Sequence, residues 1–88
     1  MVRLLVYATP LSTTDGQEYV AQAMGTQRTD GLWEGSIEFV PKEGAPLRSP
    51  RETTQPNLTD LEYWATGLTP VYLEGALERA LDSRSRAV

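Results

Sequence analysis

The sequence contains no cysteine and no histidine. Without cysteine, disulfides and the usual thiolate-bound zinc or iron–sulfur centres are excluded. Without histidine, the chain lacks the commonest general base near neutral pH and the commonest nitrogen ligand of metals. The phosphate-binding motifs GxGxxG and GKS or GKT are also missing. These absences favour a protein that is not an enzyme and holds no metal and no cofactor. Carboxylate chemistry is the enzymatic alternative that they leave.

Long hydrophobic runs are missing as well. No stretch approaches the roughly 18 apolar residues that a membrane-spanning helix needs. The first residues contain one arginine, a very short apolar stretch and no small-residue cleavage site, so they do not resemble a signal peptide. We therefore expect a cytoplasmic protein that does not contact a membrane.

Basic residues are outnumbered. The chain has eight lysines and arginines and twelve acidic residues, which gives a net charge of −4. Such a chain repels a polyphosphate backbone. Nucleic-acid binding through Arg84 and Arg86 is therefore the least favoured of the hypotheses considered below.

The chain has 88 residues, which fits a single domain over 1–88. A domain of this size buries only about 60–65% of the surface that its unfolded chain exposes. The hydrophobic share of 40% and the charged share of 23% are typical of globular proteins. We expect the chain to fold, with oligomerisation as a source of extra stability.

Alternating apolar residues predict strands over 2–9, 17–24, 32–40 and, more weakly, 47–54. The pairs Asp15–Gly16 and Asp30–Gly31 predict turns between the first three. Pro50 should interrupt the fourth strand or confine it to an edge. One face of the third strand should be buried, and the glycine within it should mark either a β-bulge or a close approach of backbone or of an aromatic ring. That face comprises Trp33, Gly35, Ile37 and Phe39.

Helical periodicity replaces alternation after residue 56. Asn57 or Thr59 can cap a short helix, and Gly67 is expected to end it in the left-handed conformation. Thr69 should cap a second helix that runs to about Asp82, and residues from about 83 to 88 should form a frayed tail. The predicted fold class is α+β, with an antiparallel meander of three or four strands followed by two C-terminal helices packed on one sheet face.

Apolar residues are expected on both faces of this sheet. The helices should bury Leu61, Trp64, Leu68, Leu73, Leu77 and Leu81 against Trp33, Ile37 and Phe39. The opposite face should carry Val2, Leu4, Val6, Val20, Leu32 and Val40. Exposed apolar patches usually mark partner surfaces. The first hypothesis is therefore a non-catalytic interaction module that docks on another protein or on itself as a homodimer.

The segment Arg48–Asn57 is unusually rich in polar groups. It leads into a helix N-terminus, where free N–H groups favour anions, and guanidinium groups suit carboxylates and phosphates. The second hypothesis is a domain that binds a small anionic ligand, or a carboxylate-dependent enzyme. Local ion pairs and helix caps explain the same residues without a ligand. The candidate binding residues are Arg48, Arg51, Glu52, Gln55 and Asn57.

Glu74, Glu78 and Asp82 are spaced four apart and form one row on the second predicted helix. Together with Asp60 or Glu62 they could hold a metal or act as an acid–base pair. A solvated helix face is the favoured explanation of the row, and no metal ligands are assigned.

Three blocks of sequence, DGLWEGSIEF from Asp30, RETTQPN from Arg51, and YWATGL from Tyr63 followed by VYLEGAL, resemble a group of small bacterial proteins. They span about the last two-thirds of the chain. No activity is attached to that group, so the resemblance implies a bacterial cytoplasmic origin and assigns no role to any residue.

Overall fold

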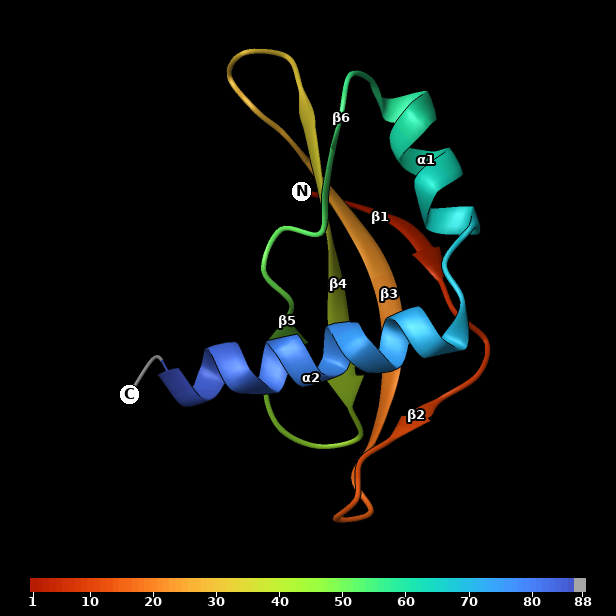
Figure 1. Ribbon diagram of the computed structural model, residues 1–88, viewed down its shortest axis with the longest axis vertical. Helices are drawn as coiled ribbons and strands as arrows, with labels where there is room; N and C mark the ends of the chain where they lie inside the picture. The colour runs from red at the N-terminus through yellow and green to blue at the C-terminus, as the bar shows by residue number, and fades with distance from the viewer. Residues whose placement is uncertain (87–88) are drawn as a thin grey trace.

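An antiparallel sheet carries two helices on one of its faces in the computed structural model (Figure 1), which describes residues 1–86 and the side chains of residues 1–84. The α+β class and the order of strands before helices confirm the sequence-based prediction. No helix in this part of the chain is long and apolar enough to cross a membrane. The elements are β1 (Val2–Val6), β2 (Leu11–Ser12), β3 (Glu18–Gln27), β4 (Trp33–Pro41), β5 (Leu47–Arg48), β6 (Thr53–Gln55), α1 (Leu58–Thr66) and α2 (Pro70–Arg86).

The long β3–β4 hairpin forms the centre of the sheet. Its register runs from Tyr19 opposite Pro41 to Gln27 opposite Trp33. β1 and β2 pair with the outer side of β3, and β5 and β6 pair with the outer side of β4. Each outer side is thus formed by two short strands. Proline interrupts the ladder between them, because its nitrogen carries no hydrogen to donate. Pro50 was expected to do so, whereas β2 was not predicted.

Both Asp-Gly turns form where the sequence predicted them. Gly16 has φ 86° and Gly31 has φ 89°, a left-handed conformation that costs glycine little. The prediction that Gly67 adopts the left-handed conformation is wrong, because its φ is −92°. Its N–H bonds back to the carbonyl oxygen of Trp64 at 3.1 Å, so α1 ends in a tight turn without reversing the sign of φ.

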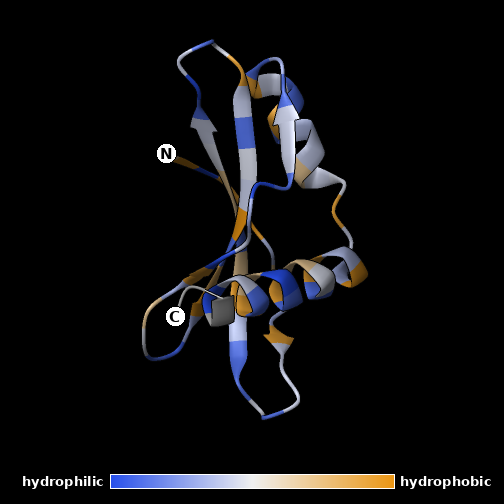
Figure 2. Ribbon diagram, turned by 60° about the vertical axis from the view of Figure 1, so that its left-hand side comes forward, coloured by the Kyte–Doolittle hydropathy of each residue, from blue (hydrophilic) through white to orange (hydrophobic). Residues whose placement is uncertain are grey.

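The hydrophobic core lies between the sheet and the helices. Phe39, Ile37 and Leu61 are the largest fully buried side chains. α1 packs near β1, β4 and β6, and α2 crosses β4 and β5 (Figure 1). The hydrophobic and hydrophilic bands that alternate along α2 in Figure 2 reflect its single buried face. Most of the predicted helix contacts are present: Leu73 and Leu77 are buried, and Trp64, Leu68 and Leu81 are packed partly buried against the core.

Two glycines let α1 approach the sheet closely. A Cβ atom at Gly25 would lie 2.7 Å from a methyl group of Leu61, and one at Gly35 would lie 2.8 Å from both Leu61 and Trp64. Atoms at these distances would clash, so the approach requires glycine at both positions. Of the two roles expected for Gly35, the close approach is the one observed. Trp33 was expected to be buried but is only half-buried.

The other face of the sheet carries no helix. Val6, Val20 and Val40 lie there as expected, but Val2 and Leu4 do not. Val2 is paired with Gly25, and an irregularity between Arg3 and Leu5 turns two successive leucines towards the core. Leu32 precedes β4 in the hairpin turn. We call this surface the open face; it comprises Arg3, Val6, Glu18, Val20, Gln22, Met24, Glu34, Ser36, Glu38, Val40 and Arg48.

The second helix is longer than its periodicity indicated. It continues past Asp82 to Arg86, where a frayed tail was expected from about residue 83. Residues 87 and 88 of that expected tail lie outside the described residues. The longer helix brings Arg84 beside the loops at the end of the sheet.

Candidate functional site

A row of polar side chains crosses the middle of the open face. The amide nitrogen Nε2 of Gln22 donates to Oε1 of Glu38 at 2.6 Å. Nη2 of Arg48 lies 3.2 Å from Oε2 of the same carboxylate. The three residues stand opposite one another on β3, β4 and β5. The Arg48 guanidinium, a predicted ligand group, therefore already has a carboxylate partner.

Arg51 lies beside Arg48 at the break between β5 and β6. Both residues line a hollow of about 210 Å³ that also includes Ser36 and Glu34. Arg51 is exposed and forms no ion pair with any side chain that the structure describes. The fold thus brings two of the five predicted binding residues together. A carboxylate shares their hollow.

Glu52 points to the opposite side of the sheet, towards α2. The hydroxyl of Tyr72 donates to Oε1 of Glu52 at 2.7 Å, and Nε of Arg79 donates to Oε2 at 3.2 Å. Nη2 of Arg79 forms a further bond to Oε1. The Glu52 side chain is only 5% exposed. A carboxylate this deeply buried needs such partners, so Glu52 serves to attach α2 to the sheet.

Burial and contact with Glu52 shift the pKa values of Tyr72 and Arg79. Burial, reinforced by the hydrogen bond to the Glu52 carboxylate, raises the pKa of Tyr72 to about 12. Glu52 in turn raises the pKa of the Arg79 guanidinium above its usual value. The Arg79 guanidinium carbon also lies 5.6 Å from the centre of the Tyr72 ring.

Gln55 and Asn57 have local structural roles. Nε2 of Gln55 donates to Oγ1 of Thr53 at 2.8 Å. Oδ1 of Asn57 accepts from the backbone N–H of Asp60 at 2.8 Å and so caps α1, which settles the choice between Asn57 and Thr59. The five predicted binding residues therefore do not converge on one ligand. Arg48 and Arg51 line one hollow, Glu52 contacts α2, Gln55 bonds within β6 and Asn57 caps α1.

The acidic row on α2 does not gather into a metal centre. Glu74 and Glu78 are exposed and line a hollow of about 370 Å³ beside the turn that follows β2. Across the described part of the chain, no three acidic side chains lie close enough to hold a metal ion. Asp60 instead sits in the first turn of α1, next to the Asn57 cap.

The open face also carries exposed apolar side chains that no other element covers. Val6 is 46% exposed and Val20 is 42% exposed. Val20 stands opposite Val40 on the neighbouring strand, and Met24 stands opposite Ser36. Apolar side chains thus border the Gln22–Glu38–Arg48 row along the sheet. The open face therefore combines a polar centre with an apolar border, as the core of a protein interface often does.

Sequence reasoning missed part of this surface. Arg3 was read only as one residue of an apolar strand, yet it projects from the open face opposite Met24. The irregularity in β1 that places it there leaves no mark in the alternation of apolar residues. No known family model, curated protein or solved structure matches this chain.

Proposed function

We propose that the protein is a non-catalytic module that associates with a second copy of itself through the open face. The observation that carries this proposal is the position of the helices, both of which pack on the same side of the sheet. The other side is left with Val6 and Val20 almost half-exposed. Burial of such side chains contributes about 25 cal/mol for each Å² removed from water.

The charges of the open face favour a second copy over an unrelated partner. Arg3 lies on β1 at one margin of the face, whereas Glu34 and Glu38 lie on β4. Arg3 forms no ion pair with a described side chain. Because a two-fold axis applies the same contact in both directions, an axis between β1 and β4 would bring Arg3 of each copy towards Glu34 and Glu38 of the other, beside the arginines that already pair with them. A face of one charge sign would repel its own copy.

The size of the molecule suits such a dimer. The domain measures 39 × 30 × 20 Å, and the sheet lies along its two longer dimensions. A typical stable interface covers about 800 Å² of each partner, about one seventh of the 5651 Å² surface of this chain. A small domain without disulfides also gains stability from the added contact.

The test is the molar mass in solution, measured by size-exclusion chromatography with light scattering. We expect a dimer for the wild-type chain and a monomer for Val20→Glu, since the substitution places two like charges near the two-fold contact. The matched control is Val71→Glu. Val71 is 77% exposed in the first turn of α2, where a carboxylate does not disturb the helix. A monomeric wild-type chain, or a dimeric Val20→Glu variant, would contradict the proposal.

The hollow between Arg48 and Arg51 supports a second candidate function, the binding of a small anion. The favouring observation is that Arg51 has no carboxylate partner among the described side chains. Inorganic phosphate should then raise the melting temperature of the wild-type protein and leave that of Arg51→Ala unchanged. An equal response of the two proteins would exclude this role for Arg51.

A further inference from the structure

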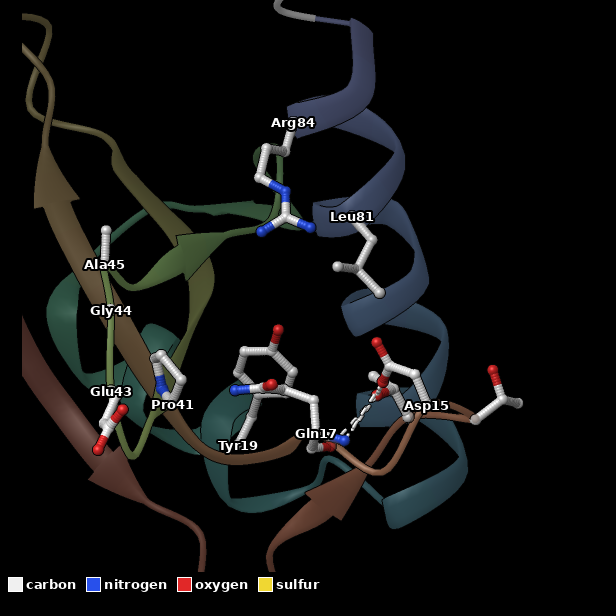
Figure 3. Close-up of a pocket in the computed structure, with 11 residues that line it drawn as sticks. Asp15, Gln17, Tyr19, Pro41, Glu43, Gly44, Ala45, Leu81 and Arg84 are labelled. Carbon is white, nitrogen blue, oxygen red and sulfur yellow. Dashed lines mark hydrogen bonds between the residues drawn. The ribbon is translucent and has the colours of Figure 1, made fainter.

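A cavity of about 400 Å³ lies at the end of the sheet, between the turn at residues 13–17, the loop at residues 41–45 and the last turns of α2 (Figure 3). Its volume falls in the range of pockets that hold small molecules. Leu81 from α2 and Pro41 at the end of β4 supply apolar walls. The cavity opens on the helix side of the sheet, so it is separate from the open face.

Tyr19 forms the floor of this cavity. The residue is only 6% exposed, yet its hydroxyl points from the floor into the cavity (Figure 3). No described residue forms a hydrogen bond with that hydroxyl. The hydroxyl oxygen itself is not buried, because no buried side-chain polar atom among the described residues lacks a hydrogen-bond partner. The hydroxyl of Tyr19 is therefore available to a molecule that enters the cavity.

Arg84 reaches the same space from α2. Its guanidinium group points into the cavity from the side opposite the floor (Figure 3) and has no ion-pair partner among the side chains of residues 1–84. The guanidinium fork and the tyrosine hydroxyl both donate hydrogen bonds. Two donors that face one space match the oxygens of a carboxylate.

The remaining charged groups at the cavity are negative. Asp15 and Glu43 lie on the turn and the loop that border it. The hydroxyl of Thr13 and the backbone N–H of Gln17 both donate to Asp15 and lower its pKa below the usual value, so this carboxylate remains ionised. The neighbouring hollow, which shares Thr13 and Leu81, adds Glu74 and Glu78. A phosphate dianion would meet repulsion here, whereas an ammonium group would be attracted.

We propose that this cavity binds a free amino acid, with the carboxylate of the ligand between Arg84 and Tyr19 and its ammonium group towards Asp15. The two ends of the cavity carry opposite charge, which is the pattern of a zwitterion. The apolar walls accommodate an aliphatic side chain. Because the cavity and the open face lie on different sides of the sheet, binding here does not depend on the dimer.

The first test uses the isotope-labelled full chain and NMR titration with each of the common L-amino acids. At least one should shift the amide signals of residues 13–17 and 41–45 and leave those at the Asp30–Gly31 turn in place. The tightest binder is then compared with its des-amino acid and with the corresponding amine. Each analogue should bind at least about tenfold more weakly, since each lacks one of the two charges.

The second test uses variants. Arg84→Gln should lower the affinity for the tightest-binding amino acid by about tenfold or more. Tyr19→Phe keeps the buried ring in place and should lower the affinity several-fold. Arg28→Gln, which removes a partly exposed arginine from the β3–β4 hairpin turn, is the matched control and should bind as the wild type does. The proposal is overturned if no amino acid binds, if the des-amino acid binds equally well, or if Arg84→Gln keeps wild-type affinity.

Discussion

Glu52 and Arg79 join the strand edge of the sheet to the middle of α2, across 27 positions of sequence. The Glu52 side chain is 5% exposed and the Arg79 side chain is 48% exposed, so the pair has a buried acidic end and a solvated basic end. Tyr72 donates a third hydrogen bond to the carboxylate. The cluster is thus a polar attachment point next to a core that is otherwise apolar.

Removing the carboxylate should loosen α2. We expect Glu52→Ala to lower the free energy of unfolding by about 1–3 kcal/mol, because the Tyr72 hydroxyl and the Arg79 guanidinium lose their shared acceptor. The measurement is urea denaturation at neutral pH. Glu78→Gln, on the exposed side of the same helix, is the control and should change stability by less than about 0.5 kcal/mol. Equal losses in the two variants would show that the buried contact contributes nothing.

The sequence predicted the elements whose signals are local. The turns at Gly16 and Gly31 and the start of α1, for which Asn57 and Thr59 were alternative caps, all depend on neighbouring residues. The anchoring role of Glu52 was not predictable, because its partner Arg79 lies on an element whose orientation depends on packing. Local polar residues suggested a single anion site at this segment, but a strand that alternates between two faces separates its side chains.

The cavity at the end of the sheet is a second feature that could not be predicted from the sequence. In β3, Tyr19 lies on the same buried face as Ala21 and Ala23, as the alternation of a strand requires. That alternation could not show that the Tyr19 hydroxyl opens into a cavity. That cavity depends on Arg84, in a part of the chain where the end of the apolar stripe suggested a frayed tail. Cavities formed between distant loops leave no periodic pattern in a sequence.

Gly35 should not tolerate a side chain. A Cβ atom there would meet Leu61 and Trp64 at 2.8 Å, so we expect Gly35→Ala to lower the free energy of unfolding by about 1–3 kcal/mol through overpacking. Gly67→Ala is the matched control: its φ is −92° and the nearest atom would be 3.7 Å away. That variant should be as stable as the wild type or slightly more stable. Thermal unfolding followed by circular dichroism distinguishes the two glycines.

Alkaline pH should weaken the fold through two tyrosines. Burial raises the pKa of both Tyr7 and Tyr72 to about 12, from an ordinary value of 10.0. Because the folded state holds these protons more tightly than the unfolded state, the stability that they contribute is complete below pH 10 and is lost between about pH 10 and 12. Urea denaturation across this range should show the decline.

The decline should be shallower in Tyr7→Phe, which removes the titrating hydroxyl that donates to the carbonyl oxygen of Ala65 at 2.7 Å. Tyr63→Phe is the control, because Tyr63 is 81% exposed. It should follow the wild-type decline. If Tyr7→Phe and Tyr63→Phe lose stability in parallel from pH 10 to 12, Tyr7 is not one of the groups responsible.

Ser49 connects the broken edge strand to the centre of the sheet. The residue is 4% exposed, and its Oγ accepts a hydrogen bond from the backbone N–H of Ile37 at 3.0 Å. Ser49 stands between β5 and β6, where the proline interrupts the ladder, so its hydroxyl supplies an acceptor that the outer strand does not. Ser49→Ala leaves the Ile37 N–H buried and unpaired, and should lower the free energy of unfolding by about 1–3 kcal/mol.

Amide hydrogen exchange gives this prediction a site-specific readout. In Ser49→Ala, exchange at Ile37 should accelerate more than exchange at Phe39, because only the first amide loses its acceptor directly. Ser36→Ala provides the matched control: Ser36 lies on the open face, and its hydroxyl has no hydrogen-bond partner among the described residues. Ser36→Ala should change the free energy of unfolding by less than about 0.5 kcal/mol. The opening free energy derived from Ile37 amide exchange should change by no more than that. A uniform acceleration over all of β4 in Ser49→Ala would instead indicate general loosening of the sheet, and would argue against a specific role for the serine hydroxyl.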